Sequence, residues 1–204
     1  HSHDMWRITA KGRFFPLDFE QASVDIKGLQ NKLSHYQNVA SLYHNKSFVQ
    51  LGESFQTITD LHIGSEQALA RVELKPNATK HNHTYLLHPL ISDSSFVAMM
   101  VVLLEAGGEV NYLPFGVNSI QTLKSTQVSG CWVHTRLMKS TQEIILYDAD
   151  VIDDNHNIVA RLKGCALKRI RTANTSQTNV RSSLNQTAIS ESSDFNTESS
   201  QALL

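Results

Sequence analysis

The sequence lacks several features that would indicate particular classes of protein. No apolar run approaches the roughly 18 residues that a membrane-spanning helix needs, so we expect no membrane association. The 18 Lys and Arg nearly balance the 19 Asp and Glu, and the formal net charge of -1 gives no electrostatic case for nucleic-acid binding. The opening residues, 1–6, show no secretory signal, so a cytoplasmic location is expected.

Cysteine is also scarce, and histidine does not occur in a metal-binding spacing. The two cysteines, Cys131 and Cys165, lie inside strand-like runs and are predicted to be buried free thiols, although the sequence alone also allows a disulfide between them. Closely spaced histidines occur as His1 with His3 and His81 with His83, without a Glu-x-x-His or Cys-x-x-Cys partner set. We therefore expect no metal site.

One segment is apolar on every side. Between Phe96 and Leu104 no residue is charged, which predicts a buried helix that ends at Gly107 and Gly108. Asp93 lies near the N-terminal end of this helix, where burial would raise the pKa of the carboxyl and the positive helix end would lower it. Such tuning suits proton transfer. The competing interpretation, which spacing alone favours, is that Ser92 or Asp93 merely caps the helix.

The remaining patterns predict strands on both sides of this helix. Residues 20–46 have helical spacing, and Pro76–His83 is a polar loop. The predicted strands are Phe55–Ile63, Gln67–Leu74, Val110–Val117, Gln127–Met138, Glu143–Ile152 and Asn157–Ile170, with a hairpin turn at Asp153–Asn155. Burying one apolar helix inside one antiparallel sheet predicts an α+β hot-dog fold. From Thr172 onward Ser, Thr, Asn and Gln dominate, so residues 172–204 are predicted to be a disordered linker or tail.

A set of short motifs resembles a known family in its order. The motifs are Gly52-Glu-Ser-Phe55, Ala68–Leu74, His88-Pro-Leu-Ile-Ser-Asp93, Tyr112-Leu-Pro-Phe115 and a closing hairpin from Asp150 to Arg169. Together they make residues 5–171 resemble the C-terminal half of the dehydratase domain of modular polyketide synthases, a double hot dog. The resemblance implies that residues 1–18 are the trailing strand of a preceding half or a linker between the halves, and that 19–171 are the second hot-dog subdomain.

The resemblance also implies a reaction, a set of site residues and partners. The reaction is elimination of water from a 3-hydroxyacyl chain on an acyl carrier protein, which needs no cofactor. In it, Asp93 would help the hydroxyl to leave, while a histidine of the N-terminal half would remove the C2 proton. The residues expected to contact the substrate are His88, Pro89, Phe55, Gly52, Leu113, Pro114, Phe115 and Val97. The expected partners are the N-terminal half, the carrier protein and a second copy within the parent synthase.

Three departures from the family pattern bear on activity. No histidine here has the His-x-x-x-Gly-x-x-x-x-Pro pattern of the family's base, so the chain alone should not dehydrate anything. Val97 stands four residues after Asp93, where the family usually has Gln or His, and Leu51 and Glu53 replace the Tyr and Pro of a Tyr-Gly-Pro turn. The alternatives are therefore a related double-bond isomerase or cyclase, or a degenerate module with a scaffold or dimerisation role.

Overall fold

The computed structural model describes residues 11–14, 16, 19–36, 39–43, 51–80, 84–108, 111–123 and 128–170. The chain divides into a compact unit, residues 1–169, and a second segment, residues 170–204, of which only Ile170 is described. The predicted tail at 172–204 therefore lies outside the described residues. Most of residues 1–18, expected to be a trailing strand or a linker, do so as well, and residues 11–14 form no strand.

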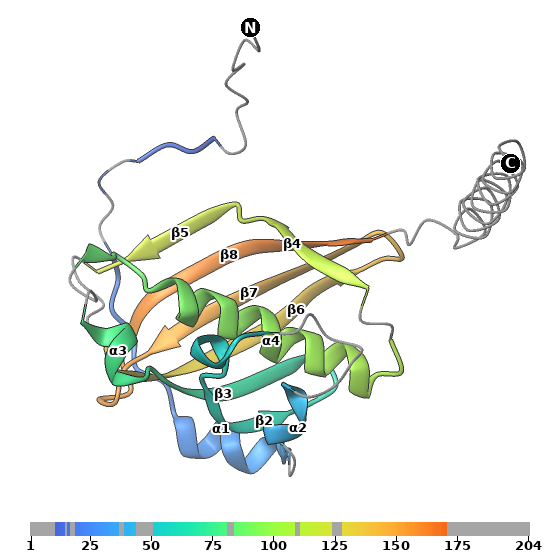
Figure 1. Cartoon of the computed structure of the whole chain (residues 1–204), viewed down its shortest axis with the longest axis horizontal. Helices are drawn as coiled ribbons and strands as arrows, with labels where there is room; N and C mark the ends of the chain where they lie inside the picture. Colours follow the sequence, from blue (N-terminus) through green and yellow to red (C-terminus); the bar gives the residue numbers. More distant parts are fainter. Residues whose placement is uncertain are drawn as a thin grey trace, which may run out of the picture. The chain divides into compact units, whose positions relative to one another are not determined.

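One antiparallel sheet forms most of the compact unit (Figure 1). Its neighbouring strands follow the order β1-β2-β3-β6-β7-β8-β4, and β5 also pairs with β8. The strands are β1 (Ser34–His35), β2 (Ile58–Ile63), β3 (Gln67–Glu73), β4 (Tyr112–Gly116), β5 (Ser119–Thr122), β6 (Gly130–Ser140), β7 (Ile144–Ile152) and β8 (Ile158–Arg169). Burial alternates along the first half of β7, where Ile145, Tyr147 and Ala149 face the covered side of the sheet.

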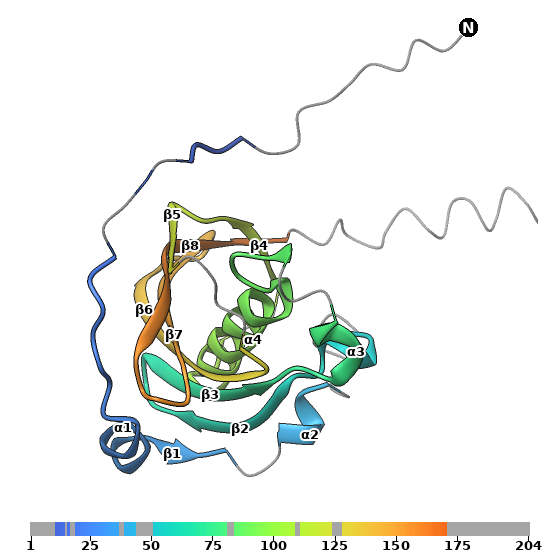
Figure 2. The ribbon, with the colours of Figure 1, turned by 90° about the vertical axis from the view of Figure 1, so that its left-hand side faces the viewer.

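The sheet curls around a single long helix, α4 (Pro89–Glu105), as Figure 2 shows. Every residue of α4 from Ser94 to Leu103 is buried, and the helix packs on β2, β3, β6 and β7. After it, Gly107 adopts φ +78, and the N–H groups of Gly107 and Gly108 donate to the carbonyls of Leu104 and Leu103. An antiparallel sheet wrapped around one buried helix is the hot-dog fold, so the predicted fold class and helix stop are confirmed.

The helical interpretation of residues 20–46 is wrong. This segment forms two short helices, α1 (Ile26–Lys32) and α2 (Val39–Leu42), on either side of β1. Leu33 turns extended at the end of α1, and the next two residues pair with Ile63 and His62 of β2. Pairing with a distant strand outweighs local helical spacing here, because it gives the edge of β2 a partner.

Smaller differences occur in the connections between the strands. A 3-10 turn, Glu53–Phe55, replaces the start of the first predicted strand, and a short helix, α3 (Pro76–Thr79), occupies the predicted polar loop. β5 was not predicted. The hairpin between β7 and β8 is confirmed, because the Asp153 carboxylate accepts from the N–H groups of Asn155 and Asn157.

Two other predictions concern the cysteines and the membrane. Cys131 and Cys165 are both buried and free, as predicted. Among the described residues, no helix combines the length and the apolar character needed to cross a lipid bilayer.

Candidate active site

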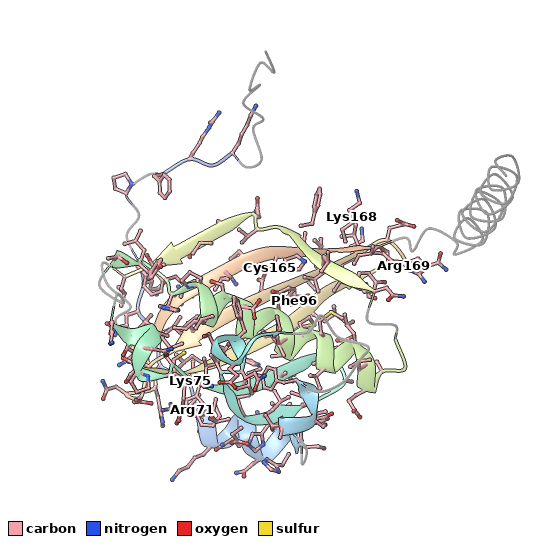
Figure 3. The ribbon with its side chains drawn as sticks, viewed as in Figure 1. Arg71, Lys75, Phe96, Cys165, Lys168 and Arg169 are labelled. Carbon is pink, nitrogen blue, oxygen red and sulfur yellow. The ribbon has the colours of Figure 1, made fainter. Side chains whose placement is uncertain are left out.

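A pocket of about 450 Å³ opens between the first turns of α4 and the strands that cover them. Its walls are mostly apolar, with a few polar groups from α4, β7 and β8. The lining residues are Phe55, Pro89, Ser92, Asp93, Ser95, Phe96, Pro114, Phe115, Gly116, Val117, Ile120, Tyr147, Leu162, Cys165, Ala166 and Leu167. Phe96 on α4 and Cys165 on β8, labelled in Figure 3, mark the helix wall and the sheet wall. An apolar cleft with few polar groups is typical of a small-molecule site.

The start of α4 determines how Asp93 is presented. His88 is the N-cap, and its Nδ1 accepts a hydrogen bond from the Leu90 N–H at 3.2 Å. Pro89 takes the first helical position, where its missing N–H leaves no bond unmade. Burial lowers the pKa of His88, which keeps its imidazole neutral and able to accept. The prediction that Ser92 or Asp93 caps the helix is therefore wrong, and Asp93 lies one turn inside it.

Asp93 combines a raised pKa with an unused oxygen. Burial raises the pKa of its carboxyl from 3.8 to about 6. Because Asp93 is past the first turn, the helix end contributes little to offset the loss of solvation. Among the described residues, its Oδ2 atom is buried without a hydrogen-bond partner. A protonated Asp93 could therefore donate to an oxygen of a molecule bound in the pocket.

A group of hydroxyl and thiol side chains lies beside Asp93. The Tyr147 hydroxyl lies 3.2 Å from the Ser95 Oγ, and it also interacts with the Cys165 thiol. Burial raises the pKa of Tyr147 above its ordinary value and that of Cys165 to about 11, so both stay protonated and neutral. Nearby Tyr43 accepts a bond from the Ile58 N–H at 3.0 Å, and burial raises its pKa too. The site therefore surrounds one carboxyl with neutral groups.

The structure brings together some of the predicted site residues and separates others. Those that line the pocket are Asp93, Pro89, Phe55, Pro114 and Phe115. Those that do not line it are His88, Gly52, Leu113 and Val97. His88 caps the helix, Val97 is 3% exposed within the core, and Gly52 and Leu113 are exposed. Val97 therefore offers the pocket no polar group in place of the family's Gln or His.

The sequence interpretation missed the polar groups that accompany Asp93. Tyr147 lies on the covered face of β7 together with Ile145 and Ala149, so the alternation of that strand contained the signal. The sequence contained less indication that Ser95 and Phe96 line the pocket, because a helix that is apolar on every side does not show which of its faces lines a cavity. Cys165 was expected only to be a buried thiol, and it also lines the pocket.

Replacing Asp93 with asparagine should stabilise the chain at alkaline pH. A raised carboxyl pKa means that the folded chain holds the proton more tightly than the unfolded chain, so wild-type stability falls as pH rises from 3.8 through about 6. The amide of the variant does not ionise in this range. After allowing for solvent screening at the pocket wall, we expect Asp93→Asn to be more stable by about 1–2 kcal/mol at pH 8 and nearly equal at about pH 3.5.

Urea unfolding at the two pH values measures this effect. The matched control is Glu105→Gln, which removes a carboxylate from the exposed end of the same helix. It should leave the stability difference between the two pH values unchanged. A stability gain for Asp93→Asn that is equal at both pH values would show that ionisation of Asp93 is not the cause.

Comparison with known proteins identifies the family. The family model described as "Polyketide synthase dehydratase N-terminal domain" matches residues 21–177. The chain belongs to the polyketide synthase dehydratase family. That description names the N-terminal domain, so the prediction that the chain is the C-terminal half stays a prediction.

Individual relatives agree with this membership. Polyketide synthase PksR of Bacillus subtilis (strain 168) is 30% identical over 173 residues, which are 85% of this chain and 7% of that synthase. The crystal structure of a trans-acyltransferase polyketide synthase enoyl-isomerase is 30% identical, with a TM-score of 0.64 over 74% of this chain and 57% of that one. The dehydratase domain of RzxB from Pseudomonas fluorescens, at 22% identity, TM-score 0.62 and coverage of 74% and 54%, supports the fold alone. The dehydratase-family chain thus spans about half the length of these structures.

Proposed function

We propose that this chain is the aspartate-bearing half of a polyketide synthase dehydratase. Its role would be to help eliminate water from a 3-hydroxyacyl chain on an acyl carrier protein, giving a 2,3-enoyl thioester. The observation that carries the proposal is Asp93, a pocket carboxyl with a pKa raised to about 6 and an oxygen that has no partner among the described residues. Hydroxide is a poor leaving group, so an acid is needed at the C3 oxygen.

The proposed step requires a base as well as this acid. The base removes the C2 proton, the released electron pair forms the C2–C3 double bond, and the C3–O bond breaks. Asp93 gives its proton to the departing oxygen, which leaves as water, and becomes a carboxylate. No histidine is among the described residues that line the pocket, so the base must come from elsewhere. We assign it to the N-terminal half of the dehydratase, as the family resemblance implies.

The pocket walls also support a thioester substrate on a carrier protein. The apolar lining suits an acyl chain, and the neutral phenol and hydroxyl of Tyr147 and Ser95 suit its polar atoms. The Lys168 ammonium lies 5.0 Å from the ring centre of Phe115, which places a positive charge beside the lining. A phosphopantetheine phosphate or an acidic carrier surface would complement this charge. We also propose that the dehydratase pairs with a second copy of itself within the parent synthase.

A second candidate function is isomerisation of a double bond. Val97 cannot steady a hydroxyl, and a double-bond shift moves only protons and expels no water. The structure of the enoyl-isomerase, at 30% identity, supports this alternative. A third candidate function is a scaffold without catalysis, since Val97 stands where the family usually has a polar Gln or His.

Product analysis with two substrates separates the three functions. The chain, produced together with the preceding segment of its parent, is given a carrier-bound 3-hydroxyacyl thioester or a 2,3-enoyl thioester. We expect loss of water from the first, detected by mass spectrometry. A shifted double bond from the second, found by NMR with no loss of water from the first, would favour the isomerase. No change in either substrate would favour the scaffold.

A further inference from the structure

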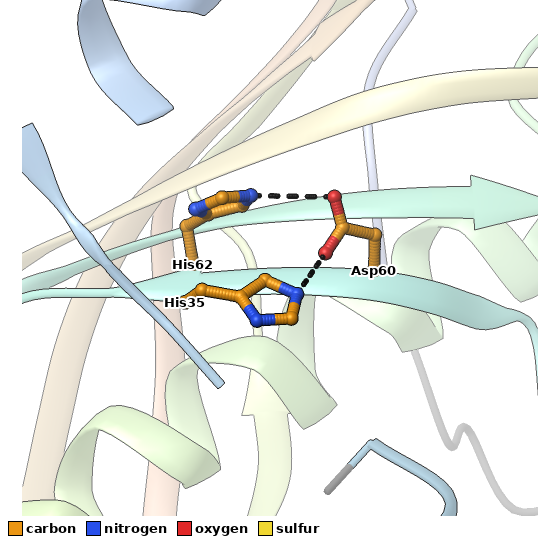
Figure 4. A group of neighbouring side chains, drawn as sticks. All are labelled: His35, Asp60 and His62. Carbon is orange, nitrogen blue, oxygen red and sulfur yellow. Dashed lines mark hydrogen bonds and ion pairs between the residues drawn. The ribbon is translucent and has the colours of Figure 1, made fainter. Parts of the chain in front are cut away.

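A second polar cluster lies where β1 pairs with β2, and none of its members lines the pocket. His35 of β1 is the register partner of His62 on β2, and Asp60 lies two residues before His62. Asp60 and His62 therefore project from the same face of β2. Leu61 between them is fully buried, so that face points away from the core. Figure 4 shows both imidazoles directed at the one carboxylate.

The distances in this cluster are close to those of a metal centre. His35 Nε2 lies 3.0 Å from Asp60 Oδ1, and His62 Nε2 lies 3.3 Å from Asp60 Oδ2. When each side chain offers one ligand atom, with Asp60 using one of its two oxygens, the three atoms lie within 4.8 Å of one another. In a tetrahedral zinc site with bonds of about 2.0–2.1 Å, neighbouring ligand atoms are roughly 3.4 Å apart. Each imidazole already lies at about this separation from one oxygen of Asp60, but the two contacts use different oxygens, so the half-exposed His35 side chain has to shift for one ion to bind all three side chains.

With the Gln30 amide in its present orientation, hydrogen bonding does not satisfy the Nε2 atom of His62. Its Nε2 lies near the Asp60 carboxylate, an acceptor, and 3.4 Å from the Gln30 side-chain nitrogen, a donor. One ring nitrogen holds either a proton or a lone pair, so it cannot satisfy both neighbours. Rotation of the Gln30 amide would present its oxygen instead, which would accept from a protonated Nε2 in the metal-free chain and would lie at a separation that suits a fourth ligand. A cation would then accept the imidazole lone pairs, the carboxylate and the amide oxygen together.

We propose that His35, Asp60 and His62 bind one Zn²⁺, with Gln30 supplying a fourth ligand. Imidazole nitrogen and carboxylate oxygen form a donor set that zinc accepts. The ion would join α1, β1 and β2, and would hold the two-residue strand β1 on the edge of the sheet. This proposal does not depend on the proposed dehydratase function. It departs from the expectation of no metal, which considered only histidines close together in the sequence.

Calorimetric titration of the full chain with zinc chloride tests the site. We expect about one Zn²⁺ per chain. His35→Ala should lower the affinity about 100-fold or more, because loss of a mere outer-shell partner already costs 10- to 100-fold. His35 is half exposed, so this variant should keep the wild-type circular dichroism. The matched control is His156→Asn, which removes an exposed imidazole outside the cluster from a left-handed position that Asn tolerates.

A structural readout supplements the affinity. Zinc should raise the melting temperature of the wild type and of His156→Asn, but not of His35→Ala. X-ray absorption should report two imidazole nitrogens and oxygen ligands at about 2.0–2.2 Å. Equal zinc affinity of the wild type and His35→Ala, or no zinc binding by the wild type, would overturn the proposal and leave a hydrogen-bonded group.

Discussion

Asp93→Asn lowers the dehydration rate of the chain joined to its partner half by about 10²–10⁴-fold, the range for losing a general acid. The amide nearly matches the carboxyl in shape, so the pocket keeps its volume. It cannot give up a proton at neutral pH, so the C3 oxygen would have to leave as hydroxide. We therefore expect the loss in kcat with little change in substrate binding.

Single-turnover mass spectrometry of a carrier-bound 3-hydroxyacyl thioester measures this rate. Glu105→Gln again serves as the control, since it alters one carboxylate of α4 far along the helix from the pocket lining. It should retain the wild-type rate. The wild-type rate should also fall as pH rises above about 6, because the acid form of Asp93 is depleted there. Equal rates for wild type and Asp93→Asn would exclude Asp93 as the acid.

Met100→Ala lowers the free energy of unfolding by about 2–5 kcal/mol. Met100 is 0% exposed and lies in the middle of α4, where the sheet surrounds the helix. Removing its thioether leaves a cavity that packed strands cannot fill without moving. The same substitution at Met138, which is 62% exposed, should change stability by less than about 0.5 kcal/mol.

Urea unfolding followed by circular dichroism measures both methionine variants. The slope of free energy against urea should match that of the wild type, which would show that the change is in stability alone. If Met100→Ala and Met138→Ala cost the same, α4 would not be the centre of the core. That outcome would also weaken the assignment of the pocket, because α4 forms one of its walls.

Local patterns in the sequence predicted the parts of the fold that rest on local chemistry. A helix with no polar stripe has to be buried, and α4 is. The turn residues Asp153–Asn155 between two strand-like runs predicted the hairpin of β7 and β8. The prediction of one helix at residues 20–46 was wrong because a long-range contact decided the structure there. The apolar spacing of this segment serves two short helices that pack separately, and the chain between them joins a distant strand.

The candidate site was only partly visible in the sequence. A motif and an apolar helix were enough to select Asp93, and five of the nine predicted residues line the pocket. The helix register was not visible, so His88 was assigned to the substrate although it caps α4. Tyr147 comes from a strand 54 residues beyond Asp93 in number, and no local pattern connects the two.

The sequence by itself determined the buried helix, the main strands and the carboxyl that the pocket contains, because hydrophobic periodicity and turn chemistry act over a few residues. Only the tertiary structure decided which groups surround that carboxyl. It also brought His35 next to Asp60 and His62. Those contacts depend on strand register, because a shift of one residue would turn the side chains of a strand to the opposite face of the sheet. Desolvation then set the raised pKa of Asp93, and desolvation is a property of the packed pocket rather than of any single residue.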